Sequence, residues 1–227
     1  SETGFEGATA VSDVGDLWKT YRDAETILID MPIGLREDSG EPRPCDVAAR
    51  ERLGSPRSSS VFPTPVRSAL DAESYAEARD RQEARTDRSI GAQTWGLADK
   101  LREVDEFMRT HDAAVGTVRE AHPELCFWAL NDGQATEYSK TGRPIAGFWE
   151  RIEILERVDD AICRDVRAAG TDLVTEGSND DLLDAFVLAV AASPLTGELR
   201  SLPAEWPDGD PGDPAGLPIE IVYPQSL

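Results

Sequence analysis

Carboxylates at a strand end and on a buried helix are the groups of this sequence that could do chemistry. Asp30 directly follows Thr26–Ile29, a short β-branched and aliphatic run that is typical of a strand covered on both faces. Ligands of open α/β sheets bind beyond the carboxyl ends of the strands, so Asp30 is a candidate ligand or catalytic acid. The alternative is that Asp30 is a turn or capping residue before Pro32.

Two further acids stand three residues apart on a helix predicted over 180–192. Asp181 and Asp184 share a face of this helix. Asp181 has a simpler explanation, because an acid in the first turn complements the helix dipole. Asp184 lies beyond that turn among apolar neighbours, where a carboxylate is costly unless it is paired or bound to a metal. Its role is therefore metal ligand or partner of a buried arginine.

Three potential ligands, Glu120, His122 and Glu124, share one strand-to-loop junction. With two histidines in the whole chain, a histidine-rich zinc site is excluded, and oxygen donors favour Mg²⁺ or Mn²⁺. The alternative is that His122 and Glu124 form the start of the next helix, with Pro123 at its first position.

Basic residues gather near two loops that could receive a phosphate through charge-assisted hydrogen bonds. Arg43 and Arg50 precede the serine run Ser58–Ser60, and Lys140 and Arg143 flank a Thr-Gly pair. Neither loop has the glycine-lysine pattern of a P-loop. The competing interpretation is a set of surface ion pairs within an acidic protein.

The charge balance is extreme. The chain has 44 acidic against 23 basic residues, a formal charge of −21, and its only lysines are Lys19, Lys100 and Lys140. The acidic side chains repel one another at this net charge unless molar salt shortens the electrostatic screening length to about 3 Å. Because the acids are scattered, we expect the salt-rich cytoplasm of a halophilic organism rather than an acidic partner-binding protein. In that setting the charge does not exclude nucleic acid, although salt weakens phosphate contacts.

Several features argue against a membrane or secreted protein. No apolar run approaches the roughly 18 residues that span a bilayer, and Ser1–Gly4 does not begin a signal peptide. Cys45, Cys126 and Cys163 form no CxxC pair, so we expect reduced thiols in a cytoplasm and no membrane partner.

The elements that must position these groups alternate between strands and helices, which indicates an α/β layered fold. We expect one domain over 1–227, with a long loop at 32–66, at most a turn of helix at 46–52, and a helical insertion at 67–110. The predicted strands cover 4–11, 26–31, 114–120 and 218–223, and the predicted helices cover 13–23, 67–87, 97–108, 148–166 and 180–192.

Several segments occur together in a characteristic order. They are Leu28-Ile29-Asp30-Met31-Pro32-Ile33-Gly34-Leu35, Arg43-Pro44-Cys45-Asp46, Ser60-Val61-Phe62-Pro63, Gln93-Thr94-Trp95, Tyr138-Ser139-Lys140 and Asp180–Ala185. Together they resemble a family of uncharacterised proteins, a domain of unknown function classed as predicted RNase H-like nucleases. The resemblance runs from about residue 26 to the final predicted strand.

The resemblance implies an RNase H-like mixed sheet with helices on both faces. In that superfamily, acids on the first strand, the fourth strand and the last helix hold two divalent metals. By position, Asp30 matches the fourth-strand acid, and Asp181 and Asp184 match the last-helix acids. The opening hairpin, with its Gly-Val-Asp-Gly type of strand, is missing before Asp30: either this protein lacks it or it lies outside these residues.

The sequence therefore predicts a nuclease that hydrolyses phosphodiesters with Mg²⁺ or Mn²⁺. Asp30 and Asp184 are the predicted metal ligands, and Asp181 and Glu120 are secondary candidates, Asp181 as a further ligand. The expected partner is a nucleic acid or a nucleotide, with strandedness and oligomeric state left open. The alternatives are an enzyme acting on nucleotides or sugar phosphates on the same fold, and a non-catalytic binding module.

Overall fold

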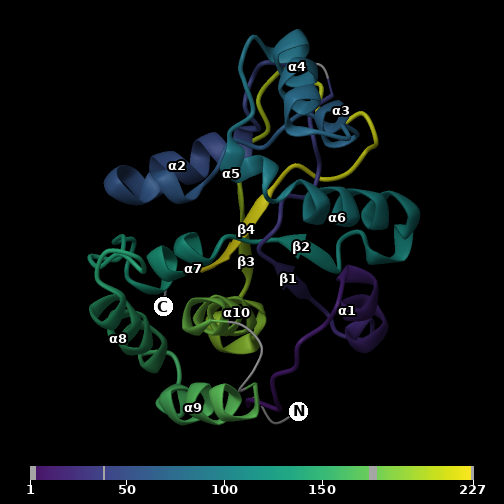
Figure 1. Cartoon of the computed structure of the whole chain (residues 1–227). Helices are drawn as coiled ribbons and strands as arrows, with labels where there is room; N and C mark the ends of the chain where they lie inside the picture. The colour runs from purple at the N-terminus through teal and green to yellow at the C-terminus, as the bar shows by residue number, and fades with distance from the viewer. Residues whose placement is uncertain (1–3, 38, 174–177, 226–227) are drawn as a thin grey trace.

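The computed structural model describes residues 4–37, 39–173 and 178–225 of the chain (Figure 1). It is a mixed α/β structure in which helices surround two small sheets. The helices are α1 (Val14–Tyr21), α2 (Pro44–Arg57), α3 (Arg67–Leu70), α4 (Tyr75–Thr86), α5 (Ala92–Trp95), α6 (Ala98–Thr110), α7 (Pro123–Leu130), α8 (Pro144–Glu156), α9 (Ile162–Asp172) and α10 (Asn179–Ala192). The strands are β1 (Ile27–Ile29), β2 (Val118–Glu120), β3 (Leu199–Leu202) and β4 (Ile221–Pro224).

The two sheets lie side by side. β1 pairs with β2 in parallel, and Ile29 is opposite Glu120 in the register. β3 and β4 are antiparallel. A single bridge between Ala121 and Val222 joins the sheets, so β1, β2, β4 and β3 follow one another across the molecule. The parallel pair directs the carboxyl ends of β1 and β2 toward the same edge.

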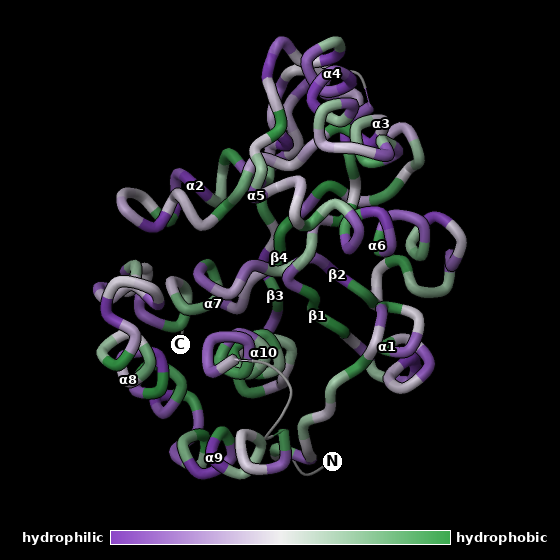
Figure 2. Tube along the Cα trace, viewed as in Figure 1, coloured by the Kyte–Doolittle hydropathy of each residue, from purple (hydrophilic) through white to green (hydrophobic). Residues whose placement is uncertain are grey.

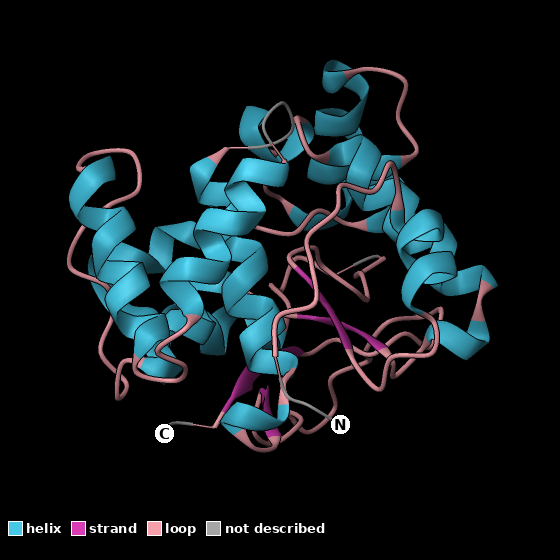
Figure 3. Cartoon of the chain, turned by 90° about the horizontal axis from the view of Figure 1, so that it is seen from below, coloured by secondary structure: helices cyan, strands magenta, loops and turns pink. Residues whose placement is uncertain are grey.

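Both faces of β1 are covered because its side chains alternate between two cores. Leu28 packs against the large core formed with α7 and α10, whereas Ile27 and Ile29 pack with residues of α1 and α6. Figure 2 shows the apolar trace of β1 between these helices, and Figure 3 shows helices on both sides of the β1–β2 pair. This explains why the strand is a continuous apolar run.

A capping box starts α10 and fixes its register. The Ser178 hydroxyl accepts the Asp181 backbone N–H, and the Asp181 carboxylate accepts the Ser178 backbone N–H at 2.8 Å. The helix then buries Leu183 and Val187 in the large core. Asp184 is consequently held one turn beyond the cap, next to the buried face.

A buried ion cluster ties the segment after β1 to α2 and β2. The Arg43 guanidinium donates from Nη2 to Asp46 Oδ1 at 2.6 Å and to Glu120 Oε1 at 2.7 Å. Its Nη1 donates to the carbonyls of Ile33 and Gly34 at 3.0 and 3.2 Å. Although burial opposes its charge, the carboxylates of Asp46 and Glu120 raise the pKa of Arg43.

Gly34 is required at the turn inside this cluster. Its φ of +77° lies in the left-handed region, and a Cβ there would come within 2.5 Å of the Pro218 carbonyl oxygen. A side chain at this position would therefore force the C-terminal segment away from the turn.

The helices predicted over 13–23, 97–108 and 180–192 are confirmed as α1, α6 and α10 within a few residues. The strand predicted over 4–11 is wrong, because that segment pairs with no strand in the described part of the chain. The expected helix over 148–166 is two helices, α8 and α9, separated by a turn.

The segment 32–66 contains more helix than the sequence indicated. Pro44 occupies the first position of α2, and Cys45, Ala49 and Leu53 recur at helical spacing on its buried side. The strand β3 was not predicted, since its half-exposed residues carry little apolar alternation. Among the described residues, no helix combines the length and apolar character needed to cross a bilayer.

The buried cluster generates a stability prediction. Arg43→Met should lower the free energy of unfolding by about 3–5 kcal/mol, because it leaves Glu120 and Asp46 buried without their partner. Urea unfolding followed by tryptophan fluorescence measures the change. Lys19→Met is the control, since Lys19 and its partner Asp16 are exposed, and its midpoint should match that of the wild type. An Arg43→Met midpoint equal to that of the control would contradict this role.

Candidate functional site

Three carboxylates converge from three different elements. Asp30 ends β1, Glu124 lies in the first turn of α7, and Asp184 lies in the second turn of α10. The Lys140 ammonium lies among them: it donates to Asp184 Oδ1 and stands 3.6 Å from Glu124 Oε1. Asp30 is close enough for Lys140 and Glu124 to shift its pKa. The sequence separation of these groups shows that tertiary packing assembles the site.

The parallel register explains how Asp30 and Glu124 meet. The Ala121 backbone N–H donates to the Ile29 carbonyl at 2.9 Å, so the chain leaving β2 runs beside Asp30. His122 then serves as the N-terminal cap position of α7, and Pro123 occupies the first helical position. The helix start predicted as the simpler alternative for this segment is thus correct, and it also turns Glu124 toward Asp30 and Lys140.

Two of the three carboxylates resist ionisation. The surrounding protein desolvates Asp30 and raises its pKa, although the residue keeps a solvent-exposed surface. Burial raises the pKa of Asp184, and the charges of Asp30 and Glu124 add to that effect against the opposing pull of Lys140. A cation placed among these groups would favour their ionised forms.

Glu124 behaves differently because two partners hold it. Arg151 Nη2 donates to Glu124 Oε1, and the Thr136 hydroxyl donates to Oε2 at 3.0 Å. Burial works to raise the pKa of Glu124, but Arg151, Lys140 and Thr136 outweigh it and lower the pKa. The site therefore contains one firmly ionised carboxylate beside two whose ionisation is costly.

Glu120 lies outside this group, although the sequence made it a candidate. Its side chain is buried in the Arg43 cluster and also accepts the Ile33 backbone N–H at 2.7 Å. The two arginines predicted to bind phosphate are likewise used inside the protein. Arg43 is saturated by the cluster, and Arg50 donates from Nε and Nη2 to the Val61 carbonyl at 3.0 and 2.8 Å. The geometry thus gives Arg43 and Arg50 structural roles in place of the expected phosphate contacts.

The remaining candidates lie at the rim of the site. Asp181 is exposed, and its carboxylate accepts both the N–H and the hydroxyl of Ser178. Arg143 is exposed on the same loop as Lys140, with its guanidinium 5.9 Å from the centre of the Tyr138 ring. Arg143 therefore remains available to an anion, whereas Asp181 is engaged as a cap.

His122, one of the potential ligands in the sequence, lies beside Asp30. It lines a small cavity of about 20 Å³ together with Asp30, Phe62 and Thr64. This volume suffices for a single water molecule. The Nδ1 atom of His122 is buried and has no hydrogen-bond partner among the described residues. The signal was the close spacing of Glu120, His122 and Glu124, which could not show which of them face the site.

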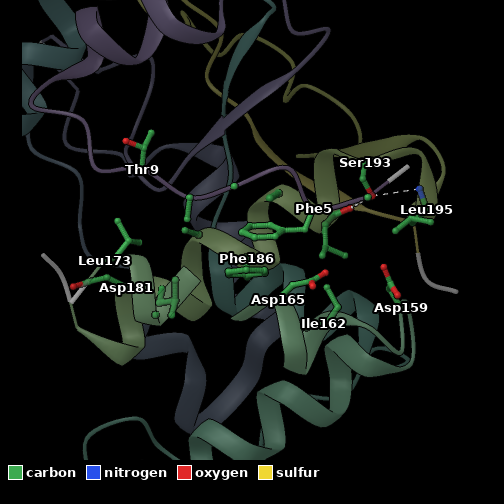
Figure 4. A pocket seen from close by; sticks show the side chains of 18 of the residues that line it. Phe5, Thr9, Asp159, Ile162, Asp165, Leu173, Asp181, Phe186, Ser193 and Leu195 are labelled. Carbon is green, nitrogen blue, oxygen red and sulfur yellow. Dashed lines mark hydrogen bonds between the residues drawn. The ribbon is translucent and has the colours of Figure 1, made fainter. Parts of the chain in front are cut away.

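A much larger cavity, of about 790 Å³, lies against the opposite face of α10 (Figure 4). Phe5 stacks on Phe186 in its wall, with ring centroids 5.2 Å apart. Asp181, Ala185 and Phe186 line this cavity, whereas Asp184 does not line it and accepts the Lys140 ammonium.

The carboxylate oxygens of the site are chemically suited to bind a hard divalent cation. Asp30, Asp184 and Glu124 offer anionic oxygens, which are the ligands that Mg²⁺ and Mn²⁺ prefer. In the part of the chain that the structure describes, no three such side chains are already arranged around a common point for a metal ion. The Lys140 ammonium stands between them, so binding requires it to leave Asp184.

Comparison with protein families gives a match over most of the chain. Residues 2–208 match the family described as "Protein of unknown function (DUF429)". No curated protein and no solved structure matches the chain. The activity must therefore be argued from the residues of this chain.

The lowered pKa of Glu124 predicts how stability depends on pH. Its ionised form stabilises the folded state above its ordinary value of 4.5, and this contribution is lost as the pH falls through the lowered pKa. Glu124→Gln should lower the free energy of unfolding at neutral pH by about 3 kcal/mol, because Arg151 stays buried. It should also flatten the stability profile below pH 4.5.

Urea unfolding at a series of pH values measures both effects. Glu153→Gln on the exposed side of α8 is the matched control and should retain the wild-type profile. Parallel profiles for Glu124→Gln and the wild type at acidic pH would show that Glu124 is not the ionised anchor of the site.

Proposed function

The chain belongs to the DUF429 family of proteins of unknown function, and we propose that it is a metal-dependent nuclease that hydrolyses phosphodiesters with Mg²⁺ or Mn²⁺. The observation that carries the proposal is the convergence of Asp30, Glu124 and Asp184 around one cationic side chain at the carboxyl ends of two parallel strands. Such a group of hard oxygen donors suits the divalent cations that enzymes use for phosphoryl transfer and phosphodiester hydrolysis.

The fold supports the proposal. β1 and β2 are parallel, helices cover both faces, and the carboxyl ends of the strands meet a helix that carries an acid. We propose an RNase H-like arrangement, in which Asp30 is the fourth-strand acid and Asp184 lies on the last helix. Three of the segments that resemble predicted RNase H-like nucleases carry Asp30, Lys140 and Asp184.

Each residue of the site has a role in this reaction. Asp30 and Asp184 hold the cation, and Glu124, fixed by Arg151 and Thr136, keeps a full negative charge beside them. When bound, the cation activates a water and stabilises charge on the phosphate oxygens. Lys140 and Arg143, on one loop, receive the phosphate through charge-assisted hydrogen bonds. The Asp181 carboxylate stays in the helix cap and takes no part.

The acidic surface sets the conditions of the reaction. With a charge of −21, the chain offers no broad basic face to a polymer, so binding relies on the cation and on Lys140 and Arg143. Molar salt screens the acids from one another and from the phosphates. We therefore propose that the protein works in a salt-rich environment, and assays belong in molar KCl.

Cleavage of short labelled oligonucleotides tests the proposal. Wild-type protein with Mn²⁺ or Mg²⁺ should cut at least one of single-stranded DNA, duplex DNA, single-stranded RNA or an RNA–DNA hybrid. Chelation should abolish the activity. Asp30→Asn and Asp184→Asn should each reduce it by about 10²-fold or more, because each removes a ligand of the cation.

Asp181→Asn is the matched control, since it alters an acid on the same helix whose carboxylate serves the cap. It should retain most of the activity. Absence of cleavage of every polymer, with Asp30→Asn and wild type indistinguishable, would refute the nuclease assignment. Turnover of a mononucleotide or sugar phosphate alone would move the activity to a different substrate class on the same fold.

A further inference from the structure

The ammonium of Lys140 contacts two of the carboxylates that a divalent cation would need, Asp184 and Glu124. It donates a hydrogen bond to Asp184 Oδ1 and lies 3.6 Å from Glu124 Oε1. Burial raises the pKa of Asp30, and the charges of His122 and Lys140 oppose that rise. One side chain thus contacts two of the acids of the site and acts on the third through its charge.

An ammonium and a divalent cation cannot share this place. Both seek the same carboxylate oxygens, and two positive charges about 4 Å apart repel each other strongly in a partly buried site. Lys140 and Asp184 are only partly exposed, with 20% and 23% of their side-chain surface accessible. Entry of a divalent cation therefore requires Lys140 to move.

The position of Lys140 in the chain allows that movement. It lies in the turn that precedes α8, and the residues that follow it, Thr141 to Arg143, are exposed. Its ammonium is a point charge on a flexible four-carbon stem, without the fixed hydrogen-bonding plane of arginine. By contrast, Arg151 on the helix α8 donates to the Gly147 carbonyl and to Glu124 and stays buried.

We propose that Lys140 is an internal counter-ion that a divalent cation displaces from Asp184 and Glu124, and that the freed ammonium then turns to the substrate phosphate beside Arg143. The inference rests on the proposed function, because it assumes that the carboxylates receive a divalent cation. It adds a coupling between two binding events. Binding of the cation frees the Lys140 ammonium, and the freed ammonium then binds the phosphate, so each ligand favours binding of the other. Without a cation, Lys140 keeps the acids neutralised.

The wild-type protein itself offers the test, because its lysines are only Lys19, Lys100 and Lys140. Amine acetylation at neutral pH in molar KCl, with and without Mn²⁺, is followed by peptide mass spectrometry. Mn²⁺ should increase the acetylation of Lys140 severalfold and leave Lys19 unchanged. Lys19 is the internal standard, since it is exposed and forms an ion pair with Asp16 at 2.9 Å.

Calorimetric titration with Mn²⁺ gives an independent measurement. Lys140→Gln should bind Mn²⁺ at least about tenfold more tightly than the wild type, because the competing charge is gone. Lys140→Arg, which keeps the charge, should bind no more tightly than the wild type, and Lys19→Gln should match it. Circular dichroism checks that the variants are folded. If Lys140→Gln does not fold, the acetylation experiment still tests the proposal, because it uses the wild-type protein.

The outcomes separate this inference from the proposed function. Mn²⁺ binding by the wild type, with unchanged Lys140 acetylation or equal affinity of Lys140→Gln, overturns the displacement and leaves the metal site standing. No Mn²⁺ binding by either protein overturns both. Binding by Lys140→Gln alone also overturns the displacement, since it shows that the ammonium excludes the metal from the wild-type site and is not displaced by it.

Discussion

The pairing of Arg43 with Glu120 and Asp46 is the interaction on which the rest of the structure depends. A buried guanidinium is tolerated only when its charge and its donors are all satisfied, and these two carboxylates with two backbone carbonyls do so. They belong to β2, α2 and the turn after β1, so satisfying one arginine brings three segments together. The edge of the β1–β2 sheet that carries Asp30 is formed when these three segments come together.

The same solution recurs elsewhere in this acidic chain. Arg67 donates to Asp105 and Asp213 at 3.0 and 2.7 Å, which fastens the C-terminal segment to α3 and α6. Asp213 also accepts the Leu35 backbone N–H. Arginine serves here because its planar fork satisfies two carboxylates at once, which a lysine ammonium does less well. The excess of acids is thus part of the interior as well as of the surface.

The candidate site differs from the Arg43 cluster because the charges of its carboxylates are only partly compensated by hydrogen bonds and ion pairs. In the Arg43 cluster, the Glu120 carboxylate accepts from Arg43 and from a backbone N–H, and it is closed to solvent. Asp30 and Asp184 have raised pKa values and remain at least partly exposed, and the one cation paired with Asp184 is a lysine, Lys140. Structural charges are paired by rigid groups, whereas these carboxylates are paired by a group that can exchange. That contrast is the physical basis for assigning function to one cluster and stability to the other.

The sequence by itself determined the local elements and two of the three acids. The apolar run before Asp30 and the serine cap before Asp184 are short-range signals, because hydrogen bonding within a strand end or a helix turn depends on neighbouring residues. The extent of α2 and the absence of a strand at 4–11 were not predictable in this way, since burial and strand pairing come from distant segments.

Only the tertiary structure decided which charges meet. Glu120 and Glu124 are four residues apart and equivalent in the sequence, yet the strand turns the first toward Arg43 and the helix turns the second toward Lys140. Lys140 reaches Asp184 across 44 positions of the chain. Ion pairs over such separations follow from how the elements pack, because the residue types alone are compatible with many partners.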